Sequence, residues 1–166
     1  TEATRKVKFI ANNANRLDEY EGDLTRILEI SLLVYNAQRI GATTGDIYIC
    51  YLYKHSLMKD RQFHIEFAQF MNKYLQIVNG KFTNQLLVFG DFNIDFNTKP
   101  DDMQIMENYG LVPTFQNTCT FFGNDSNTHI DWCFTNIPSD SHETIVYESY
   151  FSDHKPIWCC LKDKQT

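Results

Sequence analysis

The strongest structural signal in this sequence is a set of short apolar runs that stop abruptly at polar residues. The clearest run is LLVF at residues 86–89, which is followed by Gly90 and then by Asp91, Asn93 and Asp95. A short apolar run without polar alternation is typical of a buried strand, and Gly90 is expected to break that pattern. On a chain that stays extended, residues two apart point to the same side. Asp91 and Asn93 are therefore expected to share one side at the end of this strand.

Asp91 and Asn93 have two interpretations. They are turn formers, because Asp and Asn side chains bond their own backbone. Alternatively, they are a pair that contacts a hard cation and a phosphate at a strand end of an open α/β sheet, where ligands tend to bind. The stretch alone does not decide between the two.

Three further apolar runs have polar residues at an end. Tyr53 ends the run at 46–53, Asp131 lies just inside the run at 130–134, and Ser152, Asp153 and His154 precede the run at 155–161. Taken singly, each has an ordinary explanation as a strand tyrosine, a turn former or a surface histidine. Four strand ends with such residues in one chain favour a functional site.

The order of the apolar runs predicts an α/β sandwich with a mixed sheet, in one domain that spans residues 1–166. Residues 63–78 carry apolar side chains at spacings that suit one helix face, and MQIMENYG predicts a short helix stopped by Gly110. Residues 24–35 fit a strand or a helix, and their β-branched residues favour the strand. Residues 7–11 predict one more short strand.

The cysteines and the charge restrict the setting in which the protein works. Four of the five cysteines lie in apolar runs, so we expect them to be small core residues. The odd number of cysteines and the absence of a CxxC pair favour a reducing compartment over a disulfide framework. The expected location is intracellular, either nuclear or cytoplasmic, and no apolar stretch approaches the length of a membrane span. The net charge of −6 argues against a broad basic surface. It still permits a nucleic-acid enzyme whose acidic site is neutralised by a divalent cation.

Three motifs occur in a fixed order along the chain: GDFN at residues 90–93, HIDWCFTN at 129–136 and SDHKPI at 152–157. Together they resemble the endonuclease/exonuclease/phosphatase superfamily. Residues 106–122, MENYGLVPTFQNTCTFF, also resemble endonucleases of LINE-type retrotransposons and of some helicase-bearing transposons. The resemblance implies the DNase-I-like fold, which is a two-layer β-sandwich flanked by helices. It also implies hydrolysis of a phosphate ester with Mg²⁺ or Mn²⁺, most closely by a DNA endonuclease of mobile-element type.

The resemblance assigns three of these residues to the attacking water and the metal. Asp91 would orient or deprotonate the water and approach the metal, and Asn93 would hold that water and a phosphate oxygen. Asp153 would help to bind the metal, directly or through water. Carboxylate oxygens suit this task because Mg²⁺ prefers oxygen ligands.

The other three residues would act on the phosphate. His154 would contact the scissile phosphate and stabilise its developing charge, and Tyr53 would donate a hydrogen bond to a phosphate oxygen. Asp131 would hydrogen-bond His154, which fixes the tautomer of the ring and favours its protonated form.

Two metal-site residues of the family have no clear counterpart in this sequence: an asparagine on the first strand and a glutamate that also precedes the strand ending at Tyr53. Asn12, Asn13 and Asn15 match by residue type only, and Glu29 lacks the expected context. We therefore expect an N-terminally truncated domain that lacks the first strands. Such a domain would expose one apolar layer and would need a partner, a supplied segment or self-association.

The sequence leaves three functions to weigh. The first is the divalent-cation-dependent endonuclease, for which Lys54, His55, Lys59 and Arg61 are either contacts to a nucleic-acid backbone or a solvated loop. The second is a noncatalytic module that binds a partner or associates with itself. The third is a phosphatase that acts on a small phosphorylated molecule or a lipid. A Ser-His-Asp hydrolase is disfavoured because adjacent strand-end residues do not face each other and no GxSxG motif occurs.

Overall fold

The central element of the computed structural model is a mixed sheet of six strands. The structure describes residues 7–12, 28–35, 47–74, 77–78, 81–82, 85–123 and 127–162. The strands stand in the order β1 (Val7–Asn12), β2 (Leu28–Tyr35), β3 (Ile47–Lys54), β6 (Gln85–Asp91), β8 (Asp131–Thr135) and β7 (Val112–Pro113). The pair β3–β6 is parallel and the other pairs are antiparallel. The predicted mixed sheet is confirmed.

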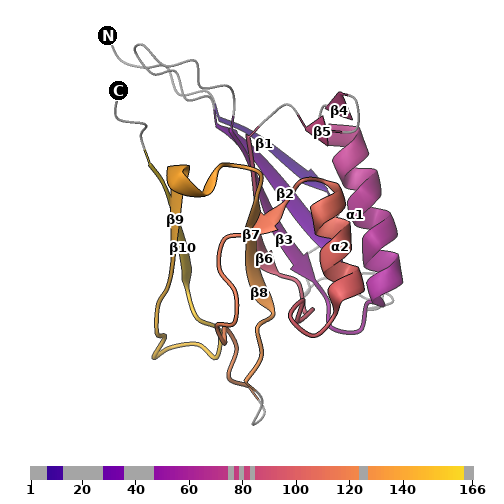
Figure 1. The fold of residues 1–166 in the computed structure, drawn as a ribbon. Coiled ribbons are helices and arrows are strands. Elements are labelled where there is room, and N and C mark those ends of the chain that lie inside the picture. Colours follow the sequence, from indigo (N-terminus) through magenta and orange to yellow (C-terminus); the bar gives the residue numbers. More distant parts are fainter. Residues whose placement is uncertain are drawn as a thin grey trace.

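Two helices, α1 (Asp60–Tyr74) and α2 (Pro100–Asn108), cover one face of this sheet (Figure 1). The α1 side chains at the predicted helical spacing are almost completely buried: Phe63, Phe67, Phe70 and Met71. They form one core with Leu86 and Val88 of β6 and with Trp132 and Phe134 of β8. Among the described residues, no helix combines the length and the apolarity needed to cross a membrane.

A two-stranded antiparallel ribbon lies against the opposite face of the sheet (Figure 1). It consists of β9 (His142–Val146), which follows the short helix η3 (Ser139–Ser141), and β10 (Ile157–Leu161). Ile157 and Cys159 pack against a second core formed by Leu87, Cys133 and Ile137. The central sheet is therefore enclosed between the helices and this ribbon. A separate small hairpin pairs β4 (Ile77–Val78) with β5 (Lys81–Phe82).

Three expectations from the sequence need correction. The helix expected over residues 63–78 ends at Tyr74, and Ile77–Val78 forms β4 instead, because its two β-branched residues pair with β5. Gly90 does not interrupt its strand, since β6 continues to Asp91. Cys160 is exposed on β10 rather than buried, whereas Cys50 and Cys133 are core residues as expected. All five cysteines are free thiols. Residues 24–27 and 75–76, which belong to two predicted elements, lie outside the described residues.

Candidate active site

The register of the sheet aligns three of the predicted site residues across neighbouring strands. Tyr53 is the Cα partner of Asp91 in the β3–β6 pair, and Asp91 is the Cα partner of Asp131 in the β6–β8 pair. Residues that are directly opposite each other in a sheet project to the same face. This row lies on the face that is turned away from the helices, because the adjacent Leu52 and Trp132 belong to the helix-side core.

Gly90 makes the close approach of β6 to β3 sterically feasible. A Cβ atom at this position would lie 1.8 Å from the carbonyl oxygen of Leu52, and φ of Gly90 is +146°. Only glycine tolerates both the contact and this backbone region. The glycine of the GDFN motif therefore determines how Asp91 is placed beside β3.

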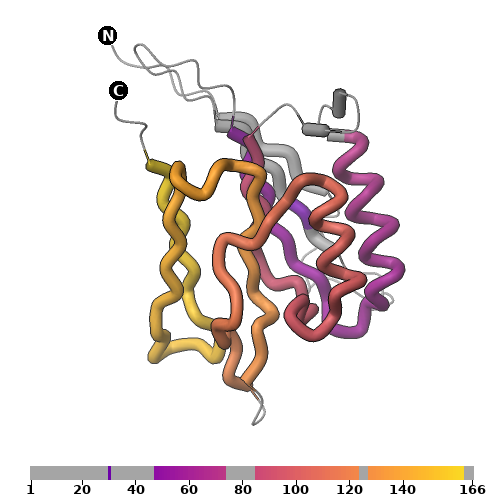
Figure 2. The backbone as a smooth tube through the Cα atoms, viewed as in Figure 1, coloured from indigo at the N-terminus to yellow at the C-terminus, as the bar shows by residue number. Residues whose placement is uncertain are grey.

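His154 reaches the row from the loop that joins β9 to β10, and two backbone contacts hold that loop in place. The N–H of Phe122 donates to the carbonyl of Asp153 at 2.9 Å, and the N–H of Lys155 donates to the carbonyl of Thr120 at 2.7 Å. Phe121 forms an isolated bridge with His154, and their ring centroids are 4.8 Å apart. Figure 2 shows the two loops meeting at the lower end of the sheet.

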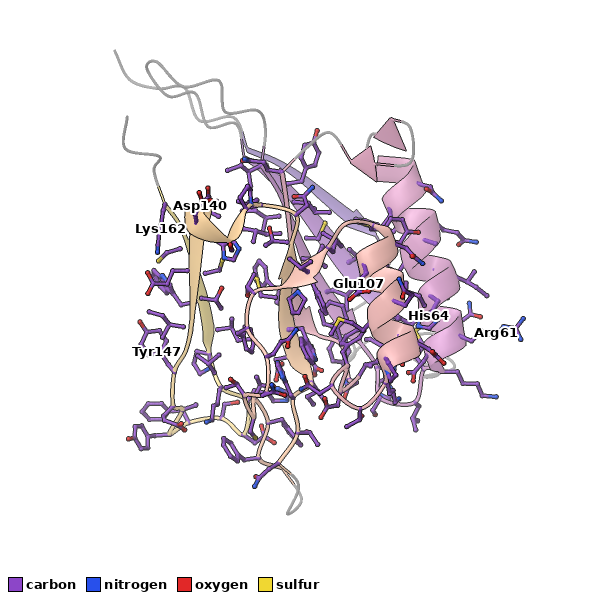
Figure 3. The ribbon with its side chains drawn as sticks, viewed as in Figure 1. Arg61, His64, Glu107, Asp140, Tyr147 and Lys162 are labelled. Carbon is purple, nitrogen blue, oxygen red and sulfur yellow. The ribbon has the colours of Figure 1, made fainter. Side chains whose placement is uncertain are left out.

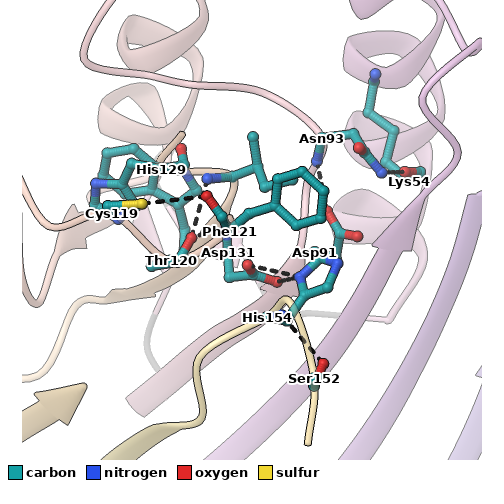
Figure 4. Close-up of polar contacts among 12 residues, drawn as sticks. Lys54, Asp91, Asn93, Cys119, Thr120, Phe121, His129, Asp131, Ser152 and His154 are labelled. Atoms are coloured by element: carbon teal, nitrogen blue, oxygen red, sulfur yellow. Dashed lines mark hydrogen bonds and ion pairs between the residues drawn. The ribbon is translucent and has the colours of Figure 1, made fainter. Parts of the chain in front are cut away.

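Asp131 and His154 form a hydrogen-bonded pair beside Asp91 (Figure 4). His154 Nδ1 lies 2.9 Å from Oδ2 and 3.1 Å from Oδ1 of Asp131. A carboxylate only accepts, so Nδ1 carries the hydrogen and Nε2 is the ring nitrogen that is left for other contacts. Ligand atoms of Asp91, Asp131 and His154 lie within 4.8 Å of one another. The structure thus brings together three of the predicted residues from β6, β8 and the β9–β10 loop.

The surroundings raise the pKa values of both Asp131 and His154. Burial works to lower the pKa of His154, but the hydrogen bond and charge of Asp131, with the charges of Asp91 and Asp153, raise that pKa above its usual value. Burial also raises the pKa of the Asp131 carboxyl, against the hydrogen bond and charge of His154 and a hydrogen bond from the Thr120 side chain. The imidazole is therefore a better cationic donor than a free histidine.

Asp91 is a partly buried carboxyl with both negative and positive groups near it. Burial raises its pKa to about 6, the charge of Asp131 adds to this, and the backbone N–H of Asn93 and the charges of His154 and Lys54 oppose it. The group is still mostly ionised at neutral pH. A carboxyl with this pKa suits proton acceptance from water near neutral pH.

Both interpretations of the residues after β6 apply. The Asp91 side chain accepts the N–H of Asn93 at 2.9 Å, and the Asp95 side chain accepts the N–H of Asn97 at 3.1 Å, so both aspartates form turns. Asp91 is also a member of the clustered group. The chain does not stay extended, because φ of Asn93 is +47°, and its side-chain amide donates to the carbonyl of Lys54 at 2.7 Å. Asn93 thereby ties the end of β6 to the end of β3.

The remaining predicted residues lie around this cluster. Tyr53 stands at the end of β3 in the aligned row, with its ring edge-on to His55. The exposed Asp153 lies beside the pair, where its charge acts on both Asp131 and His154, but it does not belong to the clustered group. Asn12 ends β1 and Glu29 is the Cα partner of Tyr53, while Asn13 and Asn15 lie outside the described residues.

The clustered residues fit a divalent cation by the chemistry of their donors. Two carboxylates and one imidazole converge, and the negative charge of Asp131 acts on Asp91. A hard divalent cation prefers carboxylate oxygens and would offset the negative charge that the two carboxylates bring together. Asp91 and Asp131 are the oxygen donors of this group, and the charge of Asp153 also acts on Asp131 and His154.

Thr120 supports the site and was not assigned a role from the sequence. It is fully buried, and its hydroxyl oxygen accepts the N–H groups of Ile130 at 3.1 Å and Asp131 at 3.0 Å. The only signal for it was its place in the TCTFF stretch of a segment that resembles transposon endonucleases. Its effect depends on a contact with β8, which the local sequence does not specify.

Lys54 fits neither interpretation from the sequence, a contact to a nucleic-acid backbone or a residue of a solvated loop. Its side chain is 1% exposed, and its Nζ lies 3.3 Å from Oδ1 of Asp60. Lys99 pairs with the other oxygen of Asp60. Lys54 therefore joins β3 to the first turn of α1, whereas Lys59 and Arg61 are exposed at the start of that helix.

Comparison with known proteins places the fold among solved structures. No protein-family model matches the sequence, and a comparison with curated proteins finds no match. The structure is similar to an endonuclease/exonuclease/phosphatase family protein from Leptotrichia buccalis, with a TM-score of 0.59. The two sequences are 16% identical, and the match covers 81% of this chain and 54% of that chain. It is also similar to the endonuclease domain of TRAS1, a telomere-specific non-LTR retrotransposon, with a TM-score of 0.62 and 15% identity over 80% of this chain and 61% of that chain.

A third similar structure is an endonuclease/exonuclease/phosphatase family protein from Bacteroides thetaiotaomicron. Its TM-score is 0.53 at 14% identity, over 93% of this chain and 61% of that chain. The chain thus spans between 54% and 61% of the length of these three structures. On the strength of this similarity and of the layers described above, this chain has the DNase-I-like fold of the endonuclease/exonuclease/phosphatase proteins.

Proposed function

We propose that this chain is a divalent-cation-dependent phosphodiester hydrolase that acts on DNA, as an endonuclease of mobile-element type. The observation that carries the proposal is the convergence of Asp91, Asp131 and His154 within 4.8 Å. The likeness to the TRAS1 endonuclease domain supports the finer assignment to mobile elements.

Asp91 is the proposed proton acceptor for the attacking water. Its carboxylate stands at the strand end, and its raised pKa of about 6 leaves it ionised at neutral pH while making it more basic than an ordinary aspartate. The water oxygen forms a bond to phosphorus, the bond from phosphorus to the leaving oxygen breaks, and the water proton passes to Asp91. The Asn93 N–H bond at 2.9 Å holds the acceptor in position.

His154 is the proposed donor to the phosphate. Asp131 accepts the hydrogen bond from Nδ1 of His154. Nε2 can therefore donate to a phosphate oxygen as negative charge develops on that oxygen. The bridge to Phe121 and the two backbone hydrogen bonds of this loop orient the ring before substrate binds. Asp91 and Asp131 would hold a divalent cation, which would supply counter-charge to the phosphate and to the leaving oxygen.

Nicking of supercoiled plasmid tests this proposal. The parent protein, Asp91→Asn, His154→Gln and the control Glu107→Gln are compared with Mg²⁺, with Mn²⁺ and with EDTA. Glu107 is an exposed carboxylate on α2, on the helix side of the sheet. We expect cation-dependent nicking by the parent and the control, and a loss of about 100-fold or more in each site variant.

Two results would contradict the proposal. One is equal nicking by the parent and by both site variants, which would identify a contaminating nuclease. The other is no nicking and no cation-induced rise in melting temperature in a folded parent protein. The second result would favour a different class of function.

A noncatalytic binding module is the second candidate function, and one observation favours it. The outward face of the β9–β10 ribbon carries exposed apolar side chains: Ile145, Tyr147 and Trp158. Figure 3 shows Tyr147 on this side of the molecule, opposite the helix that carries Arg61 and His64. A module of this kind would bind a partner or a second copy through this face without nicking DNA, and sedimentation velocity would detect the second copy.

A further inference from the structure

Two neighbouring aromatic side chains beside the candidate site have no packing role in the described structure. Tyr150 and Phe151 have relative exposures of 90% and 101%. Aromatic side chains normally bury a large apolar area, and adjacent exposed ones mark an interaction site more often than a single exposed residue does. Both lie in the loop between β9 and β10 that also carries His154.

This aromatic turn, residues 149–152, is held by its own hydrogen bonds. The hydroxyl oxygen of Ser149 accepts the N–H of Phe151 at 3.3 Å and the N–H of Ser152 at 3.1 Å. The hydroxyl oxygen of Ser152 then accepts the N–H of His154 at 3.1 Å. The backbone that presents the two rings is therefore the backbone that places His154.

A third exposed ring borders the same region. Phe122 is 46% exposed, and its N–H donates to the carbonyl of Asp153. The ammonium group of Lys155 lies 4.4 Å from the centre of the Phe122 ring and 2.7 Å from a carboxylate oxygen of Glu148. Exposed aromatic rings thus come from both loops that meet at His154.

We propose that Tyr150 and Phe151 form a stacking platform for unpaired bases of single-stranded nucleic acid whose phosphate lies at the Asp91, Asp131 and His154 cluster. This inference rests on the proposed function and names the form of its substrate. His154 lies three positions after Phe151, which limits their backbone separation to about 11 Å. At this distance, a base one or two nucleotides away from the bound phosphate can reach the two rings.

The chemistry around the turn favours bases over other partners. Glu148 and Asp153 flank the aromatic turn, and the Lys155 ammonium is engaged by Glu148, so the turn lacks the basic cluster that binds an anionic membrane. Stacking of bases on aromatic rings needs no such cluster and tolerates any sequence. A small phosphomonoester would leave both rings unused.

Binding of two labelled oligonucleotides tests the platform. One probe is a twelve-nucleotide thymidine strand, and the other has the same length and backbone but abasic residues throughout. Fluorescence anisotropy in EDTA measures their Kd values for the parent, for Tyr150→Ser/Phe151→Ser and for the control Ile65→Ser. Ile65 is an exposed apolar residue on α1, on the helix side of the sheet.

We expect the parent and the control to prefer the base-bearing strand. In the double variant, its Kd should rise by roughly 5- to 150-fold for each stacked base lost and approach that of the abasic strand. Equal Kd values of the parent for the two strands, no measurable binding by the parent, or an unchanged Kd in the double variant would overturn the platform. A parent dimer that the double variant dissociates would assign the turn to self-association and overturn it as well.

Cleavage of the abasic strand in the presence of Mg²⁺ separates this inference from the proposed function. The double variant should cleave this strand at the parent rate, because the strand has no bases to stack on the turn. Hydrolysis without a base preference would overturn the platform and leave the hydrolase standing. A base preference without hydrolysis would support the platform and contradict the hydrolase.

Discussion

Single residues determine how closely the strands of the site approach one another. Gly90 allows β6 to pass the carbonyl of Leu52, which brings Asp91 into line with Tyr53. Gly110 also has a positive φ, +71°, but a Cβ atom there would meet no atom within 4 Å. The two glycines therefore separate the effect of a clash from the effect of backbone conformation alone.

Gly90→Ala is expected to lower the free energy of unfolding by about 3 kcal/mol, because the methyl group forces β6 away from β3. Gly110→Ala should lower it by only about 1 kcal/mol, the cost of a left-handed residue other than glycine. Urea denaturation of both variants measures the difference. Equal losses would show that the contact with Leu52 does not limit the packing of the strands.

At the scale of elements, the site depends on how the start of β8 is held by the chain before it. The Thr120 hydroxyl oxygen accepts the N–H groups of Ile130 and Asp131, and it lies in a segment that pairs with residue 128 and with the β9–β10 loop. Thr120 therefore contacts residues 130 and 131 through its hydroxyl, and Thr128 and Lys155 through its backbone. Its loss should affect both the stability and the position of Asp131.

Thr120→Val keeps the shape of the side chain and leaves the two N–H groups with no acceptor at this position. We expect a loss of about 2 kcal/mol in the free energy of unfolding, because buried unsatisfied donors are costly. Hydrogen exchange at the amide of Asp131 should also become faster. Thr120→Ser retains the hydroxyl and serves as the control. If Thr120→Ser lowers the free energy of unfolding as much as Thr120→Val does, the methyl group is the stabilising part of Thr120.

At the scale of the whole molecule, buried titratable groups link stability to pH. His129 is 3% exposed, and its ring stacks on Trp132 with centroids 3.6 Å apart. Burial lowers the pKa of His129 to about 4, against the charge of Asp95 and a backbone hydrogen bond to Asp131. The amide of Asn97 contacts Nδ1 at 3.1 Å, which ties the loop after β6 to the ring.

Stability is expected to fall as the pH is lowered from about 6.5 to about 4, because the unfolded chain binds a proton on this histidine that the folded protein excludes. The His129 contribution to that loss is on the order of 3 kcal/mol. His129→Phe keeps an aromatic ring and should remove this part of the pH dependence in thermal denaturation. The raised pKa of Asp91 acts in the opposite direction, so the difference between the parent and His129→Phe isolates His129.

Asn97→Ala is the control for this measurement. It removes the hydrogen bond to His129 but keeps the titrating ring, so its pH dependence should follow that of the parent at a lower overall stability. A His129→Phe curve that runs parallel to the parent between pH 4 and 6.5 would assign the pH dependence to other groups.

Much of the secondary structure and of the candidate site was predictable from local patterns. The apolar runs predicted β3, β6, β8 and β10. For β6 and β8 the reason is that a strand in a covered sheet buries side chains on both faces, whereas β10 leaves Trp158 and Cys160 exposed. The apolar spacing after residue 63 predicted α1, and Gly110 marked the end of α2, where it donates to the carbonyl of Glu107 at 2.8 Å. The motifs, through their resemblance to the endonuclease/exonuclease/phosphatase superfamily, predicted that Asp91, Asp131 and His154 belong to one site.

Contacts between distant segments decided the rest. The register that sets Asp91 opposite Asp131, the bond from Asn93 to Lys54 and the support from Thr120 each join residues that are far apart in the chain. Local patterns report backbone preference and burial, but they carry no information on which strands pair or in what register. The sequence by itself determined the chemistry available at the strand ends. Only the tertiary structure decided which of those groups meet, because pairing and burial depend on the whole core rather than on neighbours in the chain.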